Sequence, residues 1–360
     1  MSNKQIKYLS QSKVRKVLRE CDYLVLLGER SNGKSYCAKS IAIQDAIDNG
    51  SQFIYLRRYD LDTKDSLCVS YFADLPVSNM TRGEYSCIDV YRKGIYLANI
   101  DPETNKIVRG QKIGYCHALS GAEHYKSLQF PTVKYILYEE FISFNGQYIY
   151  NESSALQQYV STIYRNNRKG KVILIGNTIS RICPYYIDWG FDKGLMKQKQ
   201  GTVDHYIKEN DNGENTDIAV FLTESLNYNS GMFFGHAAKN ITKGGYEVTP
   251  QPHLPDDVRN YKTIYKFVLQ YNNLMFLCSL LQHNTENDNI TWYITPKTTP
   301  IERSTRVVSN QFSTNPYWTR FLRGLTVSEE NVMRMIYNGR ICYSDDLCGT
   351  EFNNVIVNFR

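Results

Sequence analysis

The chain has 360 residues, of which 42% are hydrophobic and 22% charged, a balance that excludes a disordered or fibrous protein and fits about two globular domains. Lys and Arg outnumber Asp and Glu by 42 to 36, and the net charge of +6 permits an acidic polymer as partner without requiring one. The nine cysteines form no CxxC pair, which argues against a zinc site or a disulfide scaffold. We find no signal peptide and no apolar run near the ~20 residues of a membrane helix, so we expect a cytosolic protein.

The first 200 residues alternate strand and helix patterns. In chain order we expect a helix over 11–21, a buried strand in "YLVLLG", a helix from Lys34 to Asp48, a strand in "QFIYLRR", antiparallel hairpins over 85–118, a strand in "KYILYEE", a helix over 152–165 and a strand in "KVILIGNT". Strands that alternate with helices predict an α/β fold with a mostly parallel, helix-covered sheet.

The pattern changes after residue 200, where the polar, turn-rich run "KENDNGENTD" indicates a linker. Beyond it, "YKTIYKFVLQYNN" and "LMFLCSLLQ" predict a hairpin, "NITWYIT" predicts another strand, and residues 328–337 begin with a Ser cap and an acidic turn typical of a helix. We therefore divide the chain into a first domain over 1–200, a linker region over 201–235 and an α+β domain over 236–360.

The stretch "GERSNGKS", residues 28–35, matches the P-loop pattern GxxxxGK[ST] between an expected strand and an expected helix. Its backbone N–H groups and the helix N-terminus would bind phosphate oxygens. Lys34 is expected to reach the β and γ phosphates, and Ser35 to bind Mg²⁺. The guanine signature NKxD is absent, which favours ATP. The expected nucleotide contacts are Gly28, Arg30, Ser31, Asn32, Gly33, Lys34 and Ser35.

Three polar residues end the next core strands. Glu139 is expected to complete the Mg²⁺ shell, and Glu140 to orient the attacking water. The usual metal-side residue is Asp, so the division of roles between the two glutamates stays open. An adjacent glutamate is typical of P-loop ATPases whose sensor strand lies beside the P-loop strand. Asn177 would then lie at the tip of that additional strand, near the γ phosphate.

An arginine is the remaining requirement, because negative charge develops on the transferred phosphoryl group. The candidates are Arg30 inside the loop, Arg57 and Arg58 after the second strand, and Arg165 and Arg168 in "YRNNRKGK". Their positions alone do not choose among them, since most surface arginines are solvated or ion-paired.

Six segments together resemble one family. "GERSNGKS", "QFIYLRRY", "ALSGAEHYKS", "YILYEEF", "TIYRNNR" and "LIGNT" occur in the order and spacing of the genome-packaging ATPases of small short-tailed bacteriophages. The resemblance spans roughly residues 22–185 and, more loosely, 261–300. "FIYLRRY" is more specific than the P-loop, which many families share.

The resemblance implies a ring motor, a homopentamer, that drives double-stranded DNA through the portal into a preformed capsid, with a structural RNA as a further candidate partner. It implies a location in the host cytoplasm, docked transiently on the procapsid and absent from the mature virion. By position it suggests Arg165 as the arginine presented to the neighbour's ATP and Lys126 as a second charge at that junction. Arg168 is a further candidate for that coupling role.

The family's C-terminal unit resembles the RNase H-like nuclease of larger packaging terminases. An active nuclease needs clustered acids for two metals. The first expected strand, "YKFVLQYNN", contains none, and Asp288, Asp345 and Asp346 stand in turn-like contexts. We expect a vestigial nuclease fold that serves DNA or portal contact.

Two other classes of function remain open. A P-loop kinase for a small molecule would need an arginine-rich lid and an acceptor site, and the extra C-terminal domain argues against it. A nucleic-acid-binding module that merely retains a nucleotide fold is disfavoured by the intact Lys34, Ser35 and Glu140.

Overall fold

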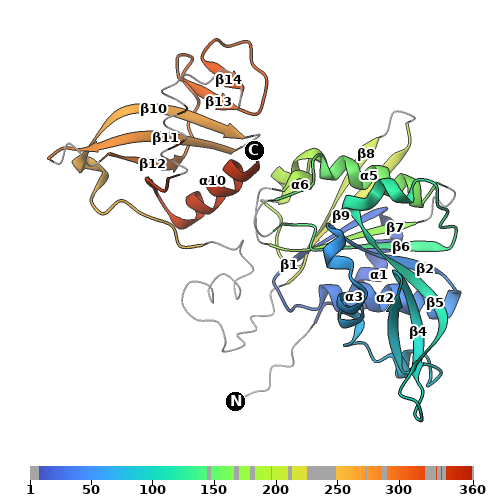
Figure 1. The fold of residues 1–360 in the computed structure, drawn as a ribbon. Helices are drawn as coiled ribbons and strands as arrows, with labels where there is room; N and C mark the ends of the chain where they lie inside the picture. The colour runs from blue at the N-terminus through green and yellow to red at the C-terminus, as the bar shows by residue number, and fades with distance from the viewer. Residues whose placement is uncertain are drawn as a thin grey trace.

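The structure, a computed structural model, describes residues 8–143, 147–165, 170–178, 183–195, 197–209, 213–224, 249–271, 274–285, 290–320 and 338–358, together with residues 330 and 334. These residues form two sheets, one of nine strands and one of six (Figure 1). No helix among them is long and apolar enough to cross a membrane.

The strands and helices expected in the first 200 residues are present. They are α1 (Gln11–Glu20), β1 (Tyr23–Gly28), α2 (Lys34–Asn49), β2 (Gln52–Arg57), the hairpin strands β3 (Cys87–Tyr91), β4 (Gly94–Ile100) and β5 (Ile107–Ala118), then β6 (Val133–Glu139), α5 (Glu152–Ile163) and β7 (Lys171–Asn177). The connections add η1 (Asp60–Thr63), α3 (Asp65–Phe72), α4 (Val77–Met80), η2 (Leu119–Tyr125), α6 (Pro184–Asp188) and α7 (Asp192–Leu195).

The nine-stranded sheet has the order β3-β4-β5-β2-β6-β7-β1-β9-β8. Strands β5, β2, β6, β7, β1 and β9 run parallel. The expected additional strand is confirmed, because β7 lies between β6 and the P-loop strand β1. Gly28 is in register with Asn177, so the P-loop begins beside the tip of β7. The carboxyl ends of these parallel strands form the edge where α/β folds bind ligands.

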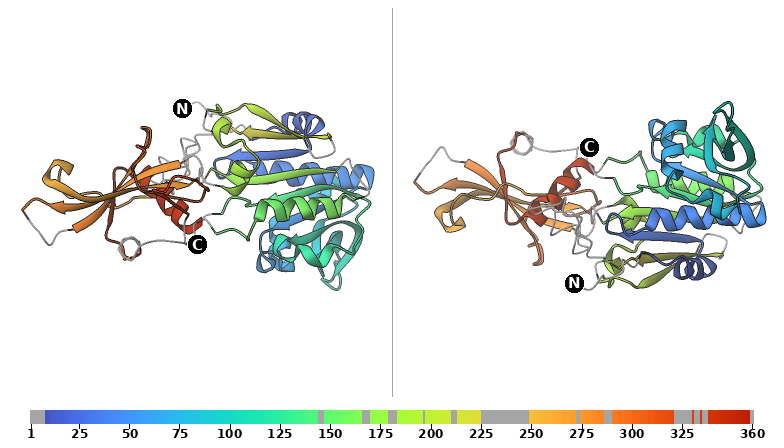
Figure 2. Two further views of the ribbon diagram at one scale, coloured as in Figure 1. Left: turned by 90° about the horizontal axis from the view of Figure 1, so that it is seen from above. Right: turned by 90° about the horizontal axis from the view of Figure 1, so that it is seen from below.

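Helices cover both faces of this sheet, as Figure 2 shows. The buried side chains of α1, α2 and α3 pack in one apolar cluster with one face of the strands, and those of α5 and α6 pack in a second cluster on the other face. Burial on both faces explains why β1, "YLVLLG", is an almost continuous apolar run rather than an alternating one.

The expected linker over 201–235 is wrong for residues 203–222. They form the antiparallel strands β8 (Val203–Glu209) and β9 (Asn215–Leu222), and β9 pairs in parallel with β1. The polar run "KENDNGENTD" is the end of β8, the turn and the start of β9. Residues 225–248 lie outside the described part of the chain. The first unit therefore extends to at least residue 222.

The second sheet is formed by β10 (Tyr261–Tyr271), β11 (Leu274–His283), β12 (Ile290–Pro296), β13 (Val307–Ser309), β14 (Trp318–Arg320) and β15 (Ile341–Tyr343), preceded by η3 (Val258–Asn260) and followed by α10 (Asp346–Asn358). Its order is β14-β13-β10-β11-β12-β15. Strands β10, β11 and β12 pair antiparallel. On the other side of β10, β13 pairs parallel with β10, and β14 pairs parallel with β13. The order of β10 to β14 is that of the expected RNase H-like sheet, and β15 adds a sixth strand parallel to β12. The helix expected over 328–337 lies almost wholly outside the described residues.

Candidate nucleotide-binding site

The P-loop connects β1 to α2 through backbone conformations that favour glycine. Gly33 is left-handed with φ 87°, and it is the residue directly before the helix. Gly28 has φ 155°, and a Cβ there would lie 1.9 Å from the Thr223 hydroxyl oxygen. Both glycines are therefore required by local geometry, one by its dihedral angle and the other by close packing.

Lys34 is folded back onto its own loop. Its ammonium group donates hydrogen bonds to the carbonyl oxygens of Gly28 at 3.2 Å and Glu29 at 2.5 Å, and to the side-chain oxygens of Asn32 at 3.1 Å and Asn177 at 3.2 Å. Burial lowers its pKa to about 8, against the opposing charges of Glu139 and Glu29. The predicted pair Lys34 and Asn177 thus lies together at the tips of β1 and β7.

Glu139 is a buried carboxylate at the last position of β6, 5% exposed. Burial raises its pKa above the ordinary value, and hydrogen bonds from Tyr71 and Ser35 and the charge of Arg57 oppose that rise. The Ser35 hydroxyl therefore lies close to the Glu139 carboxylate. A hydroxyl and a carboxylate oxygen form a donor set of the kind Mg²⁺ prefers, so these residues fit the metal expected from the sequence.

Glu140 differs from its neighbour in backbone and exposure. It is left-handed with φ 54°, an uncommon conformation for a residue other than glycine. Its side chain is 64% exposed and accepts a hydrogen bond of 2.6 Å from Arg57. One glutamate is thus buried against the P-loop serine, while the other reaches into solvent with an arginine beside it.

Arg58 was a candidate for phosphate contact, and the structure assigns it a different role. Its guanidinium pairs with buried Glu152 at 2.8 and 3.0 Å. It also donates to the carbonyl oxygens of Glu140 at 3.2 Å and Phe141 at 2.5 Å. Glu152 accepts further bonds from Tyr138, Tyr185 and the Ile149 amide. Arg58 therefore fixes the turn that carries Glu140.

A cavity of about 480 Å³ lies along the carboxyl ends of β2, β6 and β7. This volume is in the range of small-molecule sites. Its lining brings together the residues expected on the hydrolytic side, three of the candidate arginines and several loop residues. The lining residues are Arg30, Arg57, Arg58, Tyr59, Asp62, Glu139, Glu140, Ile142, Ser143, Gln147 and Asn177.

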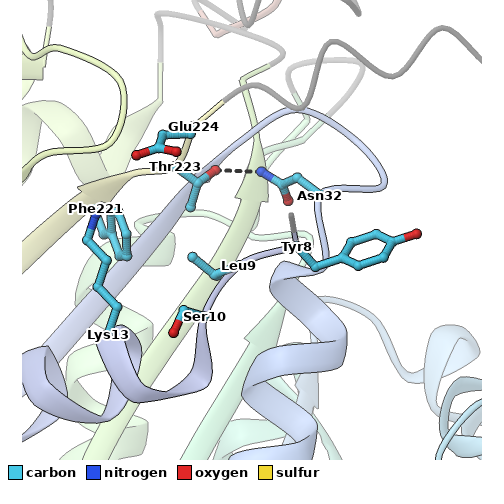
Figure 3. Close-up of a pocket in the computed structure, with 8 residues that line it drawn as sticks. All are labelled: Tyr8, Leu9, Ser10, Lys13, Asn32, Phe221, Thr223 and Glu224. Atoms are coloured by element: carbon cyan, nitrogen blue, oxygen red, sulfur yellow. Dashed lines mark hydrogen bonds between the residues drawn. The ribbon is translucent and has the colours of Figure 1, made fainter. Parts of the chain in front are cut away.

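Asn32 and Thr223 form a buried link between the P-loop and β9, here called the Asn32–Thr223 brace. The Asn32 amide donates to the Thr223 hydroxyl at 2.5 Å, and that hydroxyl donates to the Leu27 carbonyl at 2.8 Å (Figure 3). The two side chains are 2% and 3% exposed. The Asn32 side chain, expected to face the nucleotide, thus serves the loop itself, while its backbone amide remains part of the P-loop. Sequence reasoning missed Thr223 because it lies 191 residues away.

The residues expected to act in trans lie away from this cavity. Arg165 donates a hydrogen bond of 3.1 Å to the carbonyl oxygen of Lys126, so these two predicted residues are neighbours. Lys126 itself pairs with Glu123 at 2.6 Å. Neither Arg165 nor Lys126 lines the cavity of Glu139 and Glu140. Arg168 lies outside the described residues.

The acids of the C-terminal unit have structural partners. Asp345 accepts from the Cys348 amide at 2.8 Å and so caps α10. Asp346 accepts from the Gln251 amide and from His253, both at 2.9 Å. Asp288 lies outside the described residues. Within the described part of the chain, no group of three or more His, Cys, Asp or Glu side chains is placed to bind a metal ion.

Comparisons with known proteins identify relatives. The model of the podovirus DNA encapsidation protein (Gp16) family matches residues 9–200. The DNA packaging protein of Bacillus phage B103 is 31% identical over 180 residues, covering 48% of this chain and 49% of that relative. The DNA packaging protein of Bacillus phage phi29 is 31% identical over 164 residues, covering 45% and 44%. The chain thus matches about half the length of these curated relatives.

Two solved structures extend the likeness to the whole chain. A structure of the bacteriophage Phi-29 viral genome packaging motor assembly aligns with a TM-score of 0.54 at 20% identity, covering 98% of this chain and 99% of the other. A structure of the Phi-28 gp11 DNA packaging motor aligns with a TM-score of 0.50 at 16% identity, covering 99% of each. At such identities the likeness shows a shared fold that includes both units.

Proposed function

The chain belongs to the podovirus DNA encapsidation protein (Gp16) family, and on this premise we propose that it is an ATP-hydrolysing motor that moves double-stranded viral DNA through the portal into a preformed capsid. The observation that carries the proposal is the cavity beside the P-loop, which Glu139, Glu140 and Asn177 line at the ends of adjacent parallel strands, with Lys34 hydrogen-bonded to Asn177 at 3.2 Å. This arrangement has the parts that phosphoryl transfer to water requires.

Each residue has a role in the proposed reaction. The loop amides bind phosphate oxygens, and Lys34 exchanges its loop carbonyls for the β and γ phosphates. Ser35 and Glu139 would bind Mg²⁺, which when present neutralises charge on the phosphates. Glu140 orients the attacking water, and Arg57, 2.6 Å from its carboxylate, sets its position. Asn177 contacts the γ phosphate from the tip of β7.

The assembly and its partners are part of the proposal. We infer a homopentameric ring that binds DNA without sequence preference, since a translocating motor must contact backbone phosphates rather than base edges. The ring would act in the host cytoplasm, docked on the portal of the procapsid, with a structural RNA as a candidate component, and would be absent from the mature virion. The C-terminal unit, residues 249–360 at least, serves DNA or portal contact without cleaving DNA. The acid-free strand β10 and the structural partners of Asp345 and Asp346 support this.

Substitutions of Lys34 and of the two glutamates test the proposed chemistry. Lys34→Ala should abolish ATP hydrolysis and packaging together. Glu140→Gln should bind ATP and leave it intact, because the amide cannot accept the proton of the water. Binding is measured by calorimetry and turnover by phosphate release, with and without procapsids, and exposed Glu103→Gln serves as the control. If Glu139→Gln gives the trapped complex while Glu140→Gln turns over normally, the two roles are exchanged.

Mixed rings test the proposed role of Arg165. Arg165→Ala should bind ATP nearly normally, hydrolyse it poorly and recover activity when mixed with Lys34→Ala subunits. A Lys34→Ala subunit still offers its own Arg165 to the intact P-loop next door, and an arginine supplied in trans is worth about 10³–10⁵ in turnover. Mixtures no more active than the sum of the separate variants would remove Arg165 from this role and favour Arg30.

A further inference from the structure

Glu139 has a hydrogen-bond partner on α3 to which the proposed chemistry assigns no role. The Tyr71 hydroxyl, one residue before the end of that helix, donates to Glu139 Oε1 at 2.5 Å. The Ser35 hydroxyl, in the first turn of α2, lies close to the same carboxylate. Hydroxyl groups from two helices therefore border the Glu139 side chain, and the one from Tyr71 is hydrogen-bonded to it.

The ring of Tyr71 is held on several sides. It stacks on the ring of Tyr55 from β2, with 4.4 Å between ring centres, and Phe72 packs edge-on against it at 4.9 Å. The Lys39 ammonium lies 4.5 Å from the centre of the Tyr71 ring and donates to the Tyr71 carbonyl oxygen at 2.5 Å. Lys39 also pairs with Asp74. Stacking and cation–π contacts favour particular ring orientations, so the direction of the Tyr71 hydroxyl is restrained.

The helix that carries Tyr71 is anchored at both ends. At its start, the Asp65 carboxylate accepts hydrogen bonds from the backbone amides of Arg92 and Lys93, at 2.8 and 3.2 Å, in the turn between β3 and β4. At its end, Phe72 is buried in the apolar cluster that α3 shares with α2, and the Lys39 contacts tie the last turn to α2. A side chain on such a supported element can hold a precise position.

We propose that Tyr71 is a positioning residue that holds the Glu139 carboxylate in the orientation required to bind Mg²⁺. The inference rests on the proposed function, in which Glu139 and Ser35 form the metal site. Tyr71 does not line the cavity of about 480 Å³, so it acts through Glu139 rather than on the nucleotide.

The identity of residue 139 explains why a positioning residue is needed. A glutamate has one more rotatable bond than the aspartate usual at this position, so its carboxylate loses more rotamer freedom when one orientation is required. A hydrogen bond from a restrained tyrosine selects that orientation before a ligand binds. Carboxylates that bind metals are commonly hydrogen-bonded by neighbouring groups in this way.

Nucleotide binding with and without metal isolates this role. Calorimetry on the full chain with the non-hydrolysable analogue AMP-PNP gives one dissociation constant in EDTA and one in saturating Mg²⁺, and their ratio is the metal-dependent gain in affinity. Tyr71→Phe should reduce this gain by about 10-fold, as expected when a metal-binding carboxylate loses its hydrogen-bond partner, and leave the affinity in EDTA unchanged. Tyr85→Phe removes a hydroxyl from another tyrosine packed against the same apolar cluster and should change neither value.

A different donor at the same position should restore the gain. p-Aminophenylalanine at position 71 keeps the ring and offers an N–H to Glu139, so its metal-dependent gain should recover most of the wild-type value. If Tyr71→Phe no longer binds AMP-PNP in EDTA, the substitution has disturbed the fold, and the p-aminophenylalanine variant decides alone.

The outcomes separate this inference from the proposed function. An undiminished gain in Tyr71→Phe, or a gain reduced by about 10-fold in the p-aminophenylalanine variant, would overturn the role of Tyr71 and leave the metal site intact. Wild-type protein whose affinity for AMP-PNP does not depend on Mg²⁺ would overturn the metal site itself, and this inference with it.

Discussion

Lys34 illustrates how a single side chain can satisfy several acceptors of a phosphate-binding loop. Its ammonium group satisfies two loop carbonyls and two amide oxygens, so the P-loop is folded around its own cation. Nucleotide must displace these contacts with phosphate oxygens, which are stronger acceptors because they are charged. Burial disfavours the charged form of this amine and lowers the Lys34 pKa to about 8. Binding of an anion should reverse that preference.

This reversal predicts proton uptake on ATP binding. Phosphate oxygens favour charged Lys34 and raise its pKa, so binding should take up close to no proton at pH 7 and most of one proton per site at pH 9. Affinity should fall with rising pH above about 8, by up to about 10-fold per unit. Calorimetric titrations in two buffers of different ionisation enthalpy measure the uptake. If the Lys34→Arg variant binds ATP, its binding should take up no proton at either pH, because the guanidinium stays charged. Equal uptake at pH 7 and pH 9 in the wild type would contradict the expectation.

The same pKa has a consequence for stability without nucleotide. A lysine in the unfolded chain has a pKa of about 10.4, so between pH 8 and that value the unfolded state binds more protons than the folded state. The contribution of Lys34 to the free energy of unfolding therefore rises with pH across this window. Urea denaturation of wild type and Lys34→Met, compared over pH 7.5 to 9.5, should show the rise only in the wild type.

The sequence identified the residues of the P-loop and the strand ends, and in the structure Glu139, Glu140 and Asn177 line one cavity while Lys34 is hydrogen-bonded to Asn177. Their motifs are local, because Glu139, Glu140 and Asn177 end strong apolar runs and Lys34 belongs to the loop that follows one. The role of Arg58 could not be predicted from its local sequence. Its partner Glu152 is 94 residues away, and nothing in "LRRY" distinguishes Arg57, which pairs with exposed Glu140, from Arg58, which pairs with a buried carboxylate. That choice depends on which side of β2 each side chain emerges.

At the scale of elements, β9 has two roles that its sequence conceals. It completes the sheet beside β1, and the residue after it, Thr223, forms the Asn32–Thr223 brace. The local pattern indicated a linker because β8 is an edge strand with mostly exposed, polar side chains and its turn is rich in Asn, Asp and Gly. Pairing between residues almost 200 positions apart leaves no local signal. The existence of the two units was predictable from composition, whereas their boundary was not.

The brace predicts a hydroxyl-specific effect on nucleotide binding. Thr223→Val keeps the shape of the side chain but leaves the buried Asn32 amide without its acceptor, at a cost of about 1–3 kcal/mol in the free energy of unfolding. We expect ATP affinity to fall by roughly 10-fold, because Asn32 also orients Lys34. Thr223→Ser retains the hydroxyl and should bind ATP like the wild type. Urea denaturation and calorimetry report the two effects. Equal affinities for the Val and Ser variants would show that the brace does not position the loop.

At the scale of the molecule, the corrected boundary predicts how the chain can be divided. A fragment of residues 1–224 retains every strand of the nine-stranded sheet and should be soluble, unfold cooperatively and bind ATP. A fragment of residues 1–200 lacks β8 and β9. It would expose the edge of β1 and lose the buried side chains of Ile218, Ala219, Val220 and Phe221. We expect it to aggregate or to show no cooperative transition by circular dichroism. Equivalent folding and ATP binding by the two fragments would restore the linker assignment.

The distribution of tryptophan gives each unit its own optical reporter. The chain has three tryptophans. Trp189 is 3% exposed and lies edge-on to Tyr23 and Tyr185 in the first unit, at 5.3 and 5.2 Å between ring centres. Trp292 is fully buried in the second unit against Phe267, and Trp318 is half-buried on β14 of the same sheet. Replacing Trp189 with Phe confines tryptophan fluorescence, excited selectively at the red edge of the absorption band, to the second sheet. Comparing this variant with the wild type therefore reveals whether the two units lose their structure together or in sequence, without any attached dye.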